Sequence, residues 1–126
     1  MDIIGIDHIN ISTDRLAETV AFFRDALGLK EGWRPAFGAP GAWLYEGERA
    51  LVHLGVRSEP QAPSTQAALD HFAFSIADIA AARARLTKAK VAFREIEVPG
   101  GSARQIFLTD PNGVAIELNW RAAKSG

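Results

Sequence analysis

The sequence predicts an α+β protein made of two tandem copies of one unit, each with the order strand, helix and three strands. Residues 6–12 (IDHINIS) recur as residues 69–75 (LDHFAFS), at an offset of 63 residues. Residues 50–54 (ALVHL) recur as residues 114–118 (VAIEL), at an offset of 64 residues. Between these segments, apolar residues recur first at helical spacing and then in strand-like runs. A repeated unit of this kind predicts two similar βαβββ modules.

The first module is expected over about residues 4–56. Its first strand covers residues 4–12, where Ile9 and Ile11 lie on one face and polar residues lie on the other. Thr13 or Asp14 is expected to cap the following helix, and Gly28 to end it. The helix carries apolar residues at helical spacing, namely Leu16, Val20, Phe23 and Leu27. Three more strands are expected, over residues 29–37, 42–46 and 50–56.

The second module is expected over about residues 69–120, after a linker of turn composition at residues 57–68. A strand over residues 69–75 precedes a helix that Asp78 caps. Three strands follow, over residues 92–98, 104–109 and 114–119. The sequence Asp-Pro-Asn-Gly at residues 110–113 predicts a tight turn between the last two strands, because proline fixes φ and Asn and Gly tolerate positive φ. Residues 121–126 are expected to be a frayed tail.

The composition is that of one ordinary domain over residues 1–126. The net charge is −1 and the pI is about 6.3, and the basic residues form no block, so nucleic acid is excluded as an expected partner. No stretch is apolar enough for a membrane span, and no leader segment is visible, so the chain is expected to be cytoplasmic. The absence of cysteine excludes thiolate nucleophiles and Cys-type zinc sites. A small molecule is the expected partner.

Four residues are candidate metal ligands because the repeat places them at equivalent positions. His8 matches His71, and His53 matches Glu117. In the four strands concerned, alternation puts large apolar residues on one face, which must pack against the helices. All four candidates fall on the opposite face, which the twist of the sheet would make concave.

Taken singly, a histidine on a strand is more often structural than a ligand. However, the set includes every histidine of the chain, and its members share one face. We therefore interpret His8, His53, His71 and Glu117 as ligands of one divalent metal ion. Imidazole and carboxylate ligands suit zinc, nickel, iron(II), cobalt or manganese and do not select among them.

The chain resembles the vicinal oxygen chelate superfamily, which includes glyoxalase I, bleomycin-resistance proteins, methylmalonyl-CoA epimerase and extradiol dioxygenases. The resemblance rests on residues 7–9 (DHI), 22–29 (FFRDALGL), 70–71 (DH) and 110–118 (DPNGVAIEL). It implies a curved, mixed eight-stranded sheet, a cup that holds the metal, with both helices on the convex face. It also implies that His8, His71 and Glu117 stand at common ligand positions. His53 stands where glyoxalase-like members carry Glu or Gln, which is a departure from the family pattern.

The resemblance also points Trp43, Gln105 and Phe107 into the cup as substrate contacts, although aromatic residues at such places can equally fill a core. Arg34, Arg57 and Arg104 are candidates for binding a carboxylate or phosphate. A homodimer is expected, because the half-cups have unprotected strand edges. Whether one chain or two supply the ligands of each site is left open by the sequence.

Three functions are compatible with these residues. The preferred function is a glyoxalase-like, metal-dependent lyase or isomerase that acts on vicinal oxygens by proton transfer, with Glu117 and His53 as the catalytic residues. The alternatives are an iron(II) extradiol-type dioxygenase and a small-molecule binding or resistance protein without turnover. No stretch of the sequence identifies the substrate.

Overall fold

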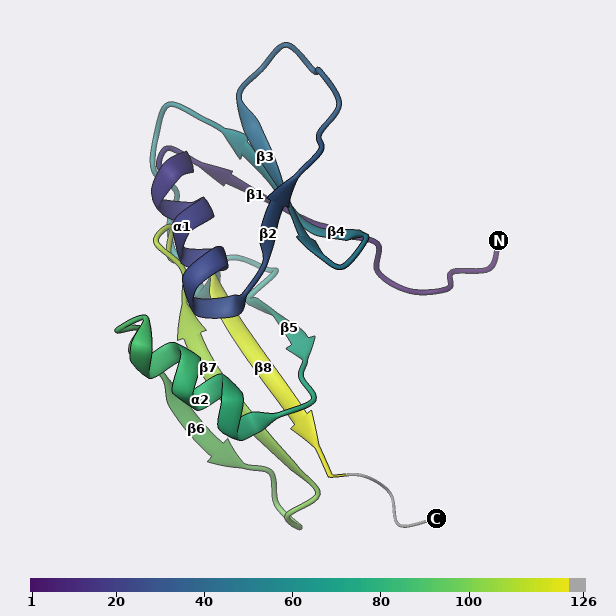
Figure 1. The fold of residues 1–126 in the computed structure, drawn as a ribbon, viewed down its shortest axis with the longest axis vertical. Coiled ribbons are helices and arrows are strands. Elements are labelled where there is room, and N and C mark those ends of the chain that lie inside the picture. The colour runs from purple at the N-terminus through teal and green to yellow at the C-terminus, as the bar shows by residue number, and fades with distance from the viewer. Residues whose placement is uncertain (123–126) are drawn as a thin grey trace.

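The computed structural model describes residues 1–122, and these residues form two βαβββ modules stacked along the long axis of the molecule (Figure 1). The predicted α+β class and the two-module plan are therefore confirmed. Of the expected frayed tail, Arg121 is the last residue of a strand, and residues 123–126 lie outside the described residues.

The first module is a four-stranded sheet with one helix. Its elements are β1 (Ile9–Thr13), α1 (Leu16–Leu27), β2 (Lys30–Gly32), β3 (Gly41–Glu46) and β4 (Arg49–Val56). The strand order is β1-β4-β3-β2, with β1 parallel to β4 and the other pairs antiparallel. The strand β1 is thus an edge strand, and the helical crossover after it is what a parallel pair requires.

The second module repeats this plan. Its elements are β5 (His71–Ser75), α2 (Ile79–Lys88), β6 (Arg94–Glu97), β7 (Ala103–Thr109) and β8 (Ala115–Arg121), and a short 3-10 helix, η1 (Ser64–Gln66), precedes them. The strand order is β5-β8-β7-β6. Asp78 caps α2 as predicted, since its side chain accepts a hydrogen bond from the Ala81 N–H at 2.9 Å.

Three local predictions differ from the structure. The first strand starts at Ile9 instead of residue 4, because residues 1–8 have no partner strand within one chain. The second strand ends at Gly32, since proline at position 35 cannot donate to a ladder. The N-cap of α1 is Arg15, without a side-chain cap, and the Thr13 hydroxyl accepts from the Arg15 N–H instead.

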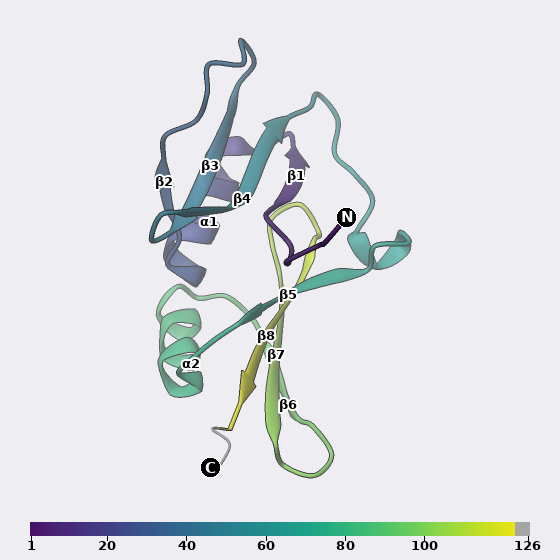
Figure 2. The same ribbon diagram turned by 90° about the vertical axis from the view of Figure 1, so that its right-hand side faces the viewer.

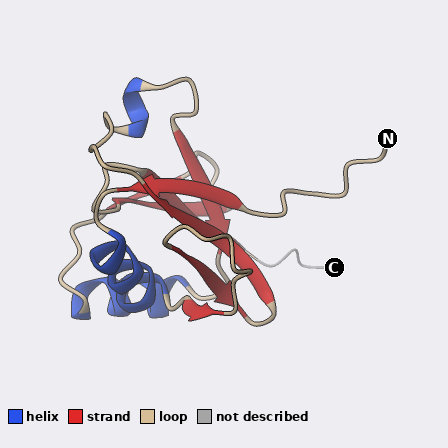
Figure 3. Ribbon diagram, turned by 90° about the horizontal axis from the view of Figure 1, so that it is seen from above, coloured by secondary structure: helices blue, strands red, loops and turns tan. Residues whose placement is uncertain are grey.

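Both helices cover the same face of the two sheets, as Figure 3 shows from above. The core beneath them includes Phe23 of α1 and Leu86 of α2, which are both fully buried. The strands contribute the alternating apolar residues that the sequence predicted, among them Ile11, Val52, Leu54, Ile116 and Leu118. The opposite face of each sheet is therefore left without a helix. No helix among residues 1–122 has the length and apolar character needed to cross a membrane.

A buried polar network joins the two modules. The predicted tight turn at residues 110–113 is present, with Gly113 at φ 83° and the Asp110 carboxylate accepting from the Asn112 and Val114 N–H groups at 2.8 Å. The Asn112 side chain reaches the first module, where it bonds to the hydroxyls of Thr13 and Thr19. Because Thr13 and Thr19 are almost completely buried, this network holds the turn of one module against the β1–α1 corner of the other.

The eight strands form two separate hydrogen-bonded sheets in one chain (Figure 2). The edge strands β1 and β5 are not paired with each other, although a hollow of about 260 Å³ has residues of both in its lining. One chain therefore presents two half-cups, and a continuous eight-stranded cup would need an additional pairing of these edges.

An ion-pair cluster contributes to the stability of the second module. Glu95 of β6 accepts from the guanidinium groups of Arg83 and Arg104, each with a shortest distance of 2.6 Å. The hydrogen bonds from Arg83 and Arg104 lower the pKa of Glu95 from 4.5 to about 2. Because the folded-state pKa is depressed, this stabilisation is present above about pH 4.5 and is lost as the pH falls toward 2.

Glu95→Gln is expected to lower the free energy of unfolding by about 1–2 kcal/mol at pH 7, because two arginines lose their charged partner. The difference from the wild type should shrink between about pH 5 and pH 2, which urea titrations at several pH values would measure. Glu97→Gln is the matched control on the same strand, since Glu97 is exposed and 3.7 Å from Arg104. A pH-independent difference would contradict the assignment.

Candidate metal centre

The four predicted ligands lie on the face of the sheets that no helix covers, and they form two pairs. His8 immediately precedes β1 and pairs with His53 of β4, whereas His71 begins β5 and pairs with Glu117 of β8. The registry explains each pair, because β1 lies beside β4 and β5 lies beside β8 in parallel. Each module thus contributes two potential ligands from neighbouring strands.

The first pair belongs to a stack of three rings. The imidazoles of His8 and His53 are parallel, with centroids 3.7 Å apart, and the indole of Trp43 covers the other side of His53 at 3.9 Å. A strand ladder positions this stack, since Trp43 is directly opposite His53 in the β3–β4 pair. Trp43, which was predicted to contact substrate, therefore also fixes the orientation of His53.

The second pair contains a buried carboxylate. Glu117 is only 8 % exposed, and its Oε1 lies 3.6 Å from His71 Nε2. The Gln105 amide donates to Oε2 of Glu117 over a long 3.4 Å. Within residues 1–122 no lysine or arginine pairs with Glu117, so this carboxylate is short of positive charge, which a cation would supply.

Each module also holds its histidine by an adjacent aspartate. Asp7 Oδ1 lies 2.7 Å from His8 Nδ1, and Asp70 Oδ1 lies 2.7 Å from His71 Nδ1. Because a carboxylate only accepts, the neutral imidazole in each pair is the tautomer with its proton on Nδ1 and a lone pair on Nε2. This tautomer, oriented by a carboxylate, is the one that metal-ligating histidines adopt. The donor set therefore fits a divalent transition metal.

The shifted pKa values of His53 and Asp7 are also compatible with metal binding. Burial lowers the pKa of His53 below its ordinary 6.5, and the neighbouring His8 lowers it further. The hydrogen bond from His8 lowers the pKa of Asp7. His53 is therefore neutral at pH 7 and can donate a lone pair or accept a proton.

One chain does not bring the two pairs together. Among residues 1–122 no group of three or more His, Cys, Asp or Glu side chains is close enough to hold a metal ion. Two large apolar residues at repeat-equivalent positions flank the pairs and remain exposed, Ile6 at 81 % and Leu69 at 74 %. The faces beside His8 and His71 are thus incompletely covered in a single chain.

The other residues that were predicted to contact substrate lie in both modules, and one of them is already engaged in ion pairs. Phe107 lies opposite Glu117 in the β7–β8 pair, and the guanidinium of Arg94 lies over its ring at 4.7 Å. Arg34 lies over the ring of Phe37 at 4.9 Å, in the first module. Arg104 is not available for an anionic ligand, because it pairs with Glu95 and Glu97.

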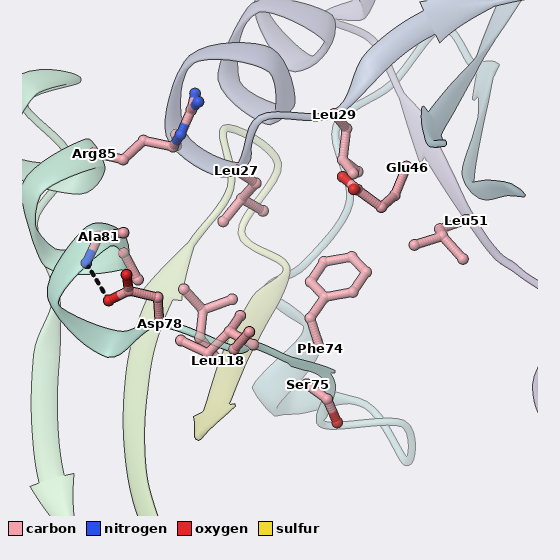
Figure 4. Close-up of a pocket in the computed structure, with 14 residues that line it drawn as sticks. Leu27, Leu29, Glu46, Leu51, Phe74, Ser75, Asp78, Ala81, Arg85 and Leu118 are labelled. Carbon is pink, nitrogen blue, oxygen red and sulfur yellow. Dashed lines mark hydrogen bonds between the residues drawn. The ribbon is translucent and has the colours of Figure 1, made fainter. Parts of the chain in front are cut away.

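A hollow of about 810 Å³ includes Asp70, His71 and Phe107 in its lining. Another cleft lies away from these residues, on the side of the helices (Figure 4). It encloses about 430 Å³ between α1, α2 and β5, with Leu27, Phe74 and Leu118 in its wall and Arg85 at its rim. Arg85 donates to the carbonyl oxygens of Arg24 and Asp25 at the end of α1. A smaller hollow of about 330 Å³ lies at the ligand face, lined by Asp7, Trp43 and His53 among others.

The aspartates beside the histidines were not among the predicted site residues. The signal was present, since Asp-His occurs at the same place in both repeats, as Asp7-His8 and Asp70-His71. The loop between β2 and β3, which holds Trp33 and Phe37, has no counterpart of similar sequence in the second module, so the repeat gave no indication of these exposed aromatic residues.

A model of the Glyoxalase/Bleomycin resistance protein/Dioxygenase superfamily matches residues 5–118. The chain belongs to this superfamily. It is also 33% identical over 120 residues to the uncharacterized protein YaeR of Escherichia coli (strain K12), covering 90% of this chain and 93% of that protein. The predicted resemblance to the vicinal oxygen chelate superfamily is therefore confirmed.

Solved structures agree with this superfamily fold. A putative glyoxalase family protein from Bacillus anthracis superposes with a TM-score of 0.80 at 24% identity, covering 97% of this chain and 98% of that one. The fosfomycin resistance protein FosX from Listeria monocytogenes superposes with a TM-score of 0.75 at 19% identity, covering 98% of both chains. At these identities the likeness shows the fold alone, so the reaction must be argued from the site of this superfamily member.

Asp70→Ala is expected to weaken zinc binding about 10- to 100-fold, because His71 loses the carboxylate that fixes its tautomer. Competition with a chromophoric chelator would measure the change. Asp25→Ala is the control, since Asp25 lies at the end of α1 and its carboxylate contacts Arg24. Equal zinc affinity in Asp70→Ala and the wild type would contradict the role of Asp70 in preparing His71 for metal binding.

Proposed function

We propose that this protein is a metal-dependent lyase or isomerase that acts on a small substrate with vicinal oxygens. The observation that carries the proposal is the matched pair of half-sites. Each module presents an Asp-oriented histidine beside a second ligand, His53 in one module and Glu117 in the other. Two ligands per module are too few for a stable site, whereas four together suit a divalent transition metal.

We further propose that each metal centre is shared by two chains of a homodimer. The support is that His8 and His53 do not meet His71 and Glu117 within residues 1–122 of one chain. The edge strands β1 and β5, which carry the two Asp-His pairs at their starts, have unpaired outer edges. Pairing β1 of one chain with β5 of another would close an eight-stranded cup and would cover Ile6 and Leu69.

In this centre His8, His71 and Glu117 would hold the metal, and His53 would be either a fourth ligand or a proton acceptor. A bound divalent metal would supply Lewis acidity toward two substrate oxygens. His53 is neutral at pH 7 and is held by its stacking on Trp43, so it is able to take a proton from a bound substrate. Gln105 and Phe107 lie beside Glu117 and would contact the substrate.

The count of ligands favours this reaction over extradiol cleavage of catechols in the arrangement in which His53 is a fourth ligand and not in the one in which it is a free proton acceptor. Four protein ligands leave about two positions on an octahedral metal, which suits a substrate that chelates through two oxygens. Cleavage with dioxygen needs about three positions, so it would require His53 to stand off the metal.

Mixed dimers test whether the centre is shared. His8→Ala/His53→Ala and His71→Ala/Glu117→Ala homodimers should each lose cobalt(II) binding. A heterodimer of the two variants should recover one intact site of the two, because one of its cups receives both unaltered modules. Cobalt absorption and stoichiometry of the separated heterodimer would measure the recovery.

If each site is built within a single chain, the same heterodimer should show no recovery, because each of its chains carries one module with both ligands replaced. Retention of full cobalt binding by both double variants would show that the four residues are not the ligands. Sedimentation analysis at micromolar concentration gives the control for assembly, and a monomeric wild type would contradict the shared centre.

His53→Gln is expected to keep metal binding with an affinity loss of less than about 100-fold and to keep some isomerase-type turnover. An amide oxygen can still coordinate, but it is a weaker proton acceptor than imidazole. Assays with hemithioacetals and acyl-CoA epimers would measure turnover. Oxygen uptake with catechols by the iron-loaded wild type, without turnover of these substrates, would favour the dioxygenase.

A further inference from the structure

The loop between β2 and β3, residues 33–40, brings the Arg34 side chain against Gly41 at the start of β3. A Cβ atom at Gly41 would lie 2.6 Å from Arg34 Nη2 and 2.7 Å from Arg34 Cζ, and it would also meet the Leu54 carbonyl oxygen. Gly41 is opposite Gly55 in the β3–β4 pair. The guanidinium thus occupies a place on the sheet that any side chain at Gly41 would close.

The Arg34 guanidinium is held but not neutralised. Its Nη1 donates to the Ala39 carbonyl oxygen at 2.9 Å, and its Cζ lies 4.9 Å from the centre of the Phe37 ring. Its Nε is buried and has no hydrogen-bond partner. Within residues 1–122 no carboxylate lies within ion-pair distance of Arg34. A buried donor without an acceptor is costly, and the guanidinium as a whole has no counter-charge, which an anionic ligand would supply.

The Phe37 ring beside this cation belongs to a group of aromatic residues that includes exposed members. Trp33 and Phe37 are 71 % and 60 % exposed, although both are large apolar residues. Trp33 meets Trp43 edge to face at 5.9 Å, and Phe37 lies 6.3 Å from Trp43. Because Trp43 also stacks on His53, a continuous aromatic surface leads from the loop to the first half of the metal centre.

The two features are close enough for one small molecule. Along β3 and β4, the Gly41–Gly55 pair is two residues from the Trp43–His53 pair. Two strand residues span about 7 Å. An anionic group at Arg34 and an oxygen pair near His53 can therefore belong to the same compact ligand.

We propose that Arg34 and the aromatic residues Trp33, Phe37 and Trp43 form a subsite that selects anionic substrates with a flat, apolar body. Its ligand carries a carboxylate, phosphate or phosphonate group that accepts from Arg34 while the apolar body lies on the rings. This inference rests on the proposed function only for placing the vicinal oxygens at the metal. The subsite itself is built from one module and does not require the metal.

A purely structural arginine would be arranged differently. A guanidinium that only braces a loop uses its donors on backbone carbonyls, as Arg85 does on Arg24 and Asp25. Arg34 uses one such contact, to Ala39, and leaves its buried Nε without an acceptor. The planar fork of an arginine binds carboxylate or phosphate through two parallel donors.

Binding of simple probes to the metal-free protein at pH 8 tests the subsite. Benzoate and benzamide have the same ring and differ in charge, and acetate has the charge without the ring. Benzoate is expected to bind at least tenfold tighter than benzamide and acetate, since a hydrogen bond to a charged group contributes about 1.5–3 kcal/mol. Quenching of tryptophan fluorescence or ligand-observed NMR would measure the affinities. Phenylphosphonate tests whether a phosphonate binds better than a carboxylate.

Arg34→Gln should abolish the preference for benzoate over benzamide, and Arg34→Lys should reduce it at least threefold. Arg15→Gln is the matched control, because Arg15 is an exposed arginine of the same module at the start of α1. Circular dichroism and the tryptophan emission of each variant verify the fold, and Arg34→Lys decides the test if Arg34→Gln is unfolded. Equal binding of benzoate and benzamide, or an unchanged preference in the Arg34 variants, would overturn the subsite.

The outcome is independent of the metal centre. If the wild type binds cobalt normally but shows no preference for benzoate over benzamide, the subsite is overturned and the proposed reaction is unaffected. Failure of the mixed dimers to recover cobalt binding, with the benzoate preference intact, would overturn the shared centre alone.

Discussion

Burial of one face of each sheet beneath α1 and α2 is the constraint on which the rest of the structure depends. Phe23 and Leu86 anchor the helices on the strand residues that alternate inward, and both are fully buried. Because strand side chains alternate, this packing commits His53 and Glu117 to the uncovered face. The core and the ligand face are therefore specified by the same alternation, and a one-residue slip in registry would destroy both.

The two modules share one plan, but the candidate ligands that they provide to the proposed metal centre are not the same. Both modules begin with an Asp-His pair at an edge strand, but the second ligand is an imidazole in one module and a carboxylate in the other. The Asn112 network fixes the first module relative to the second by bonding to Thr13 and Thr19. This connection holds the half-sites of one chain apart, so that in the proposed dimer each metal centre takes one half-site from each chain.

The residues of the proposed anion subsite lie mainly in a part of the chain that is not repeated. The β2–β3 loop holds Trp33, Arg34 and Phe37, whereas the corresponding connection of the second module, residues 98–102, is made of Val, Pro, Gly and Ser. A loop can change its side chains without disturbing a ladder or the core. The metal ligands and the proposed recognition residues can thus vary independently.

The sequence by itself determined the two-module plan, the core face and the common face of the four candidate ligands, because these follow from local periodicity and from the repeat. It determined the caps at Asp78 and Gly28 and the turn at residues 110–113, which depend on local backbone chemistry. Only the tertiary structure decided which ligands meet, since the angle between the modules depends on contacts such as Asn112 with Thr19, 93 residues apart. It also decided that Arg104 is paired and that Arg34 keeps a buried donor without an acceptor, because the partners of a long side chain are set by packing and not by its neighbours in sequence.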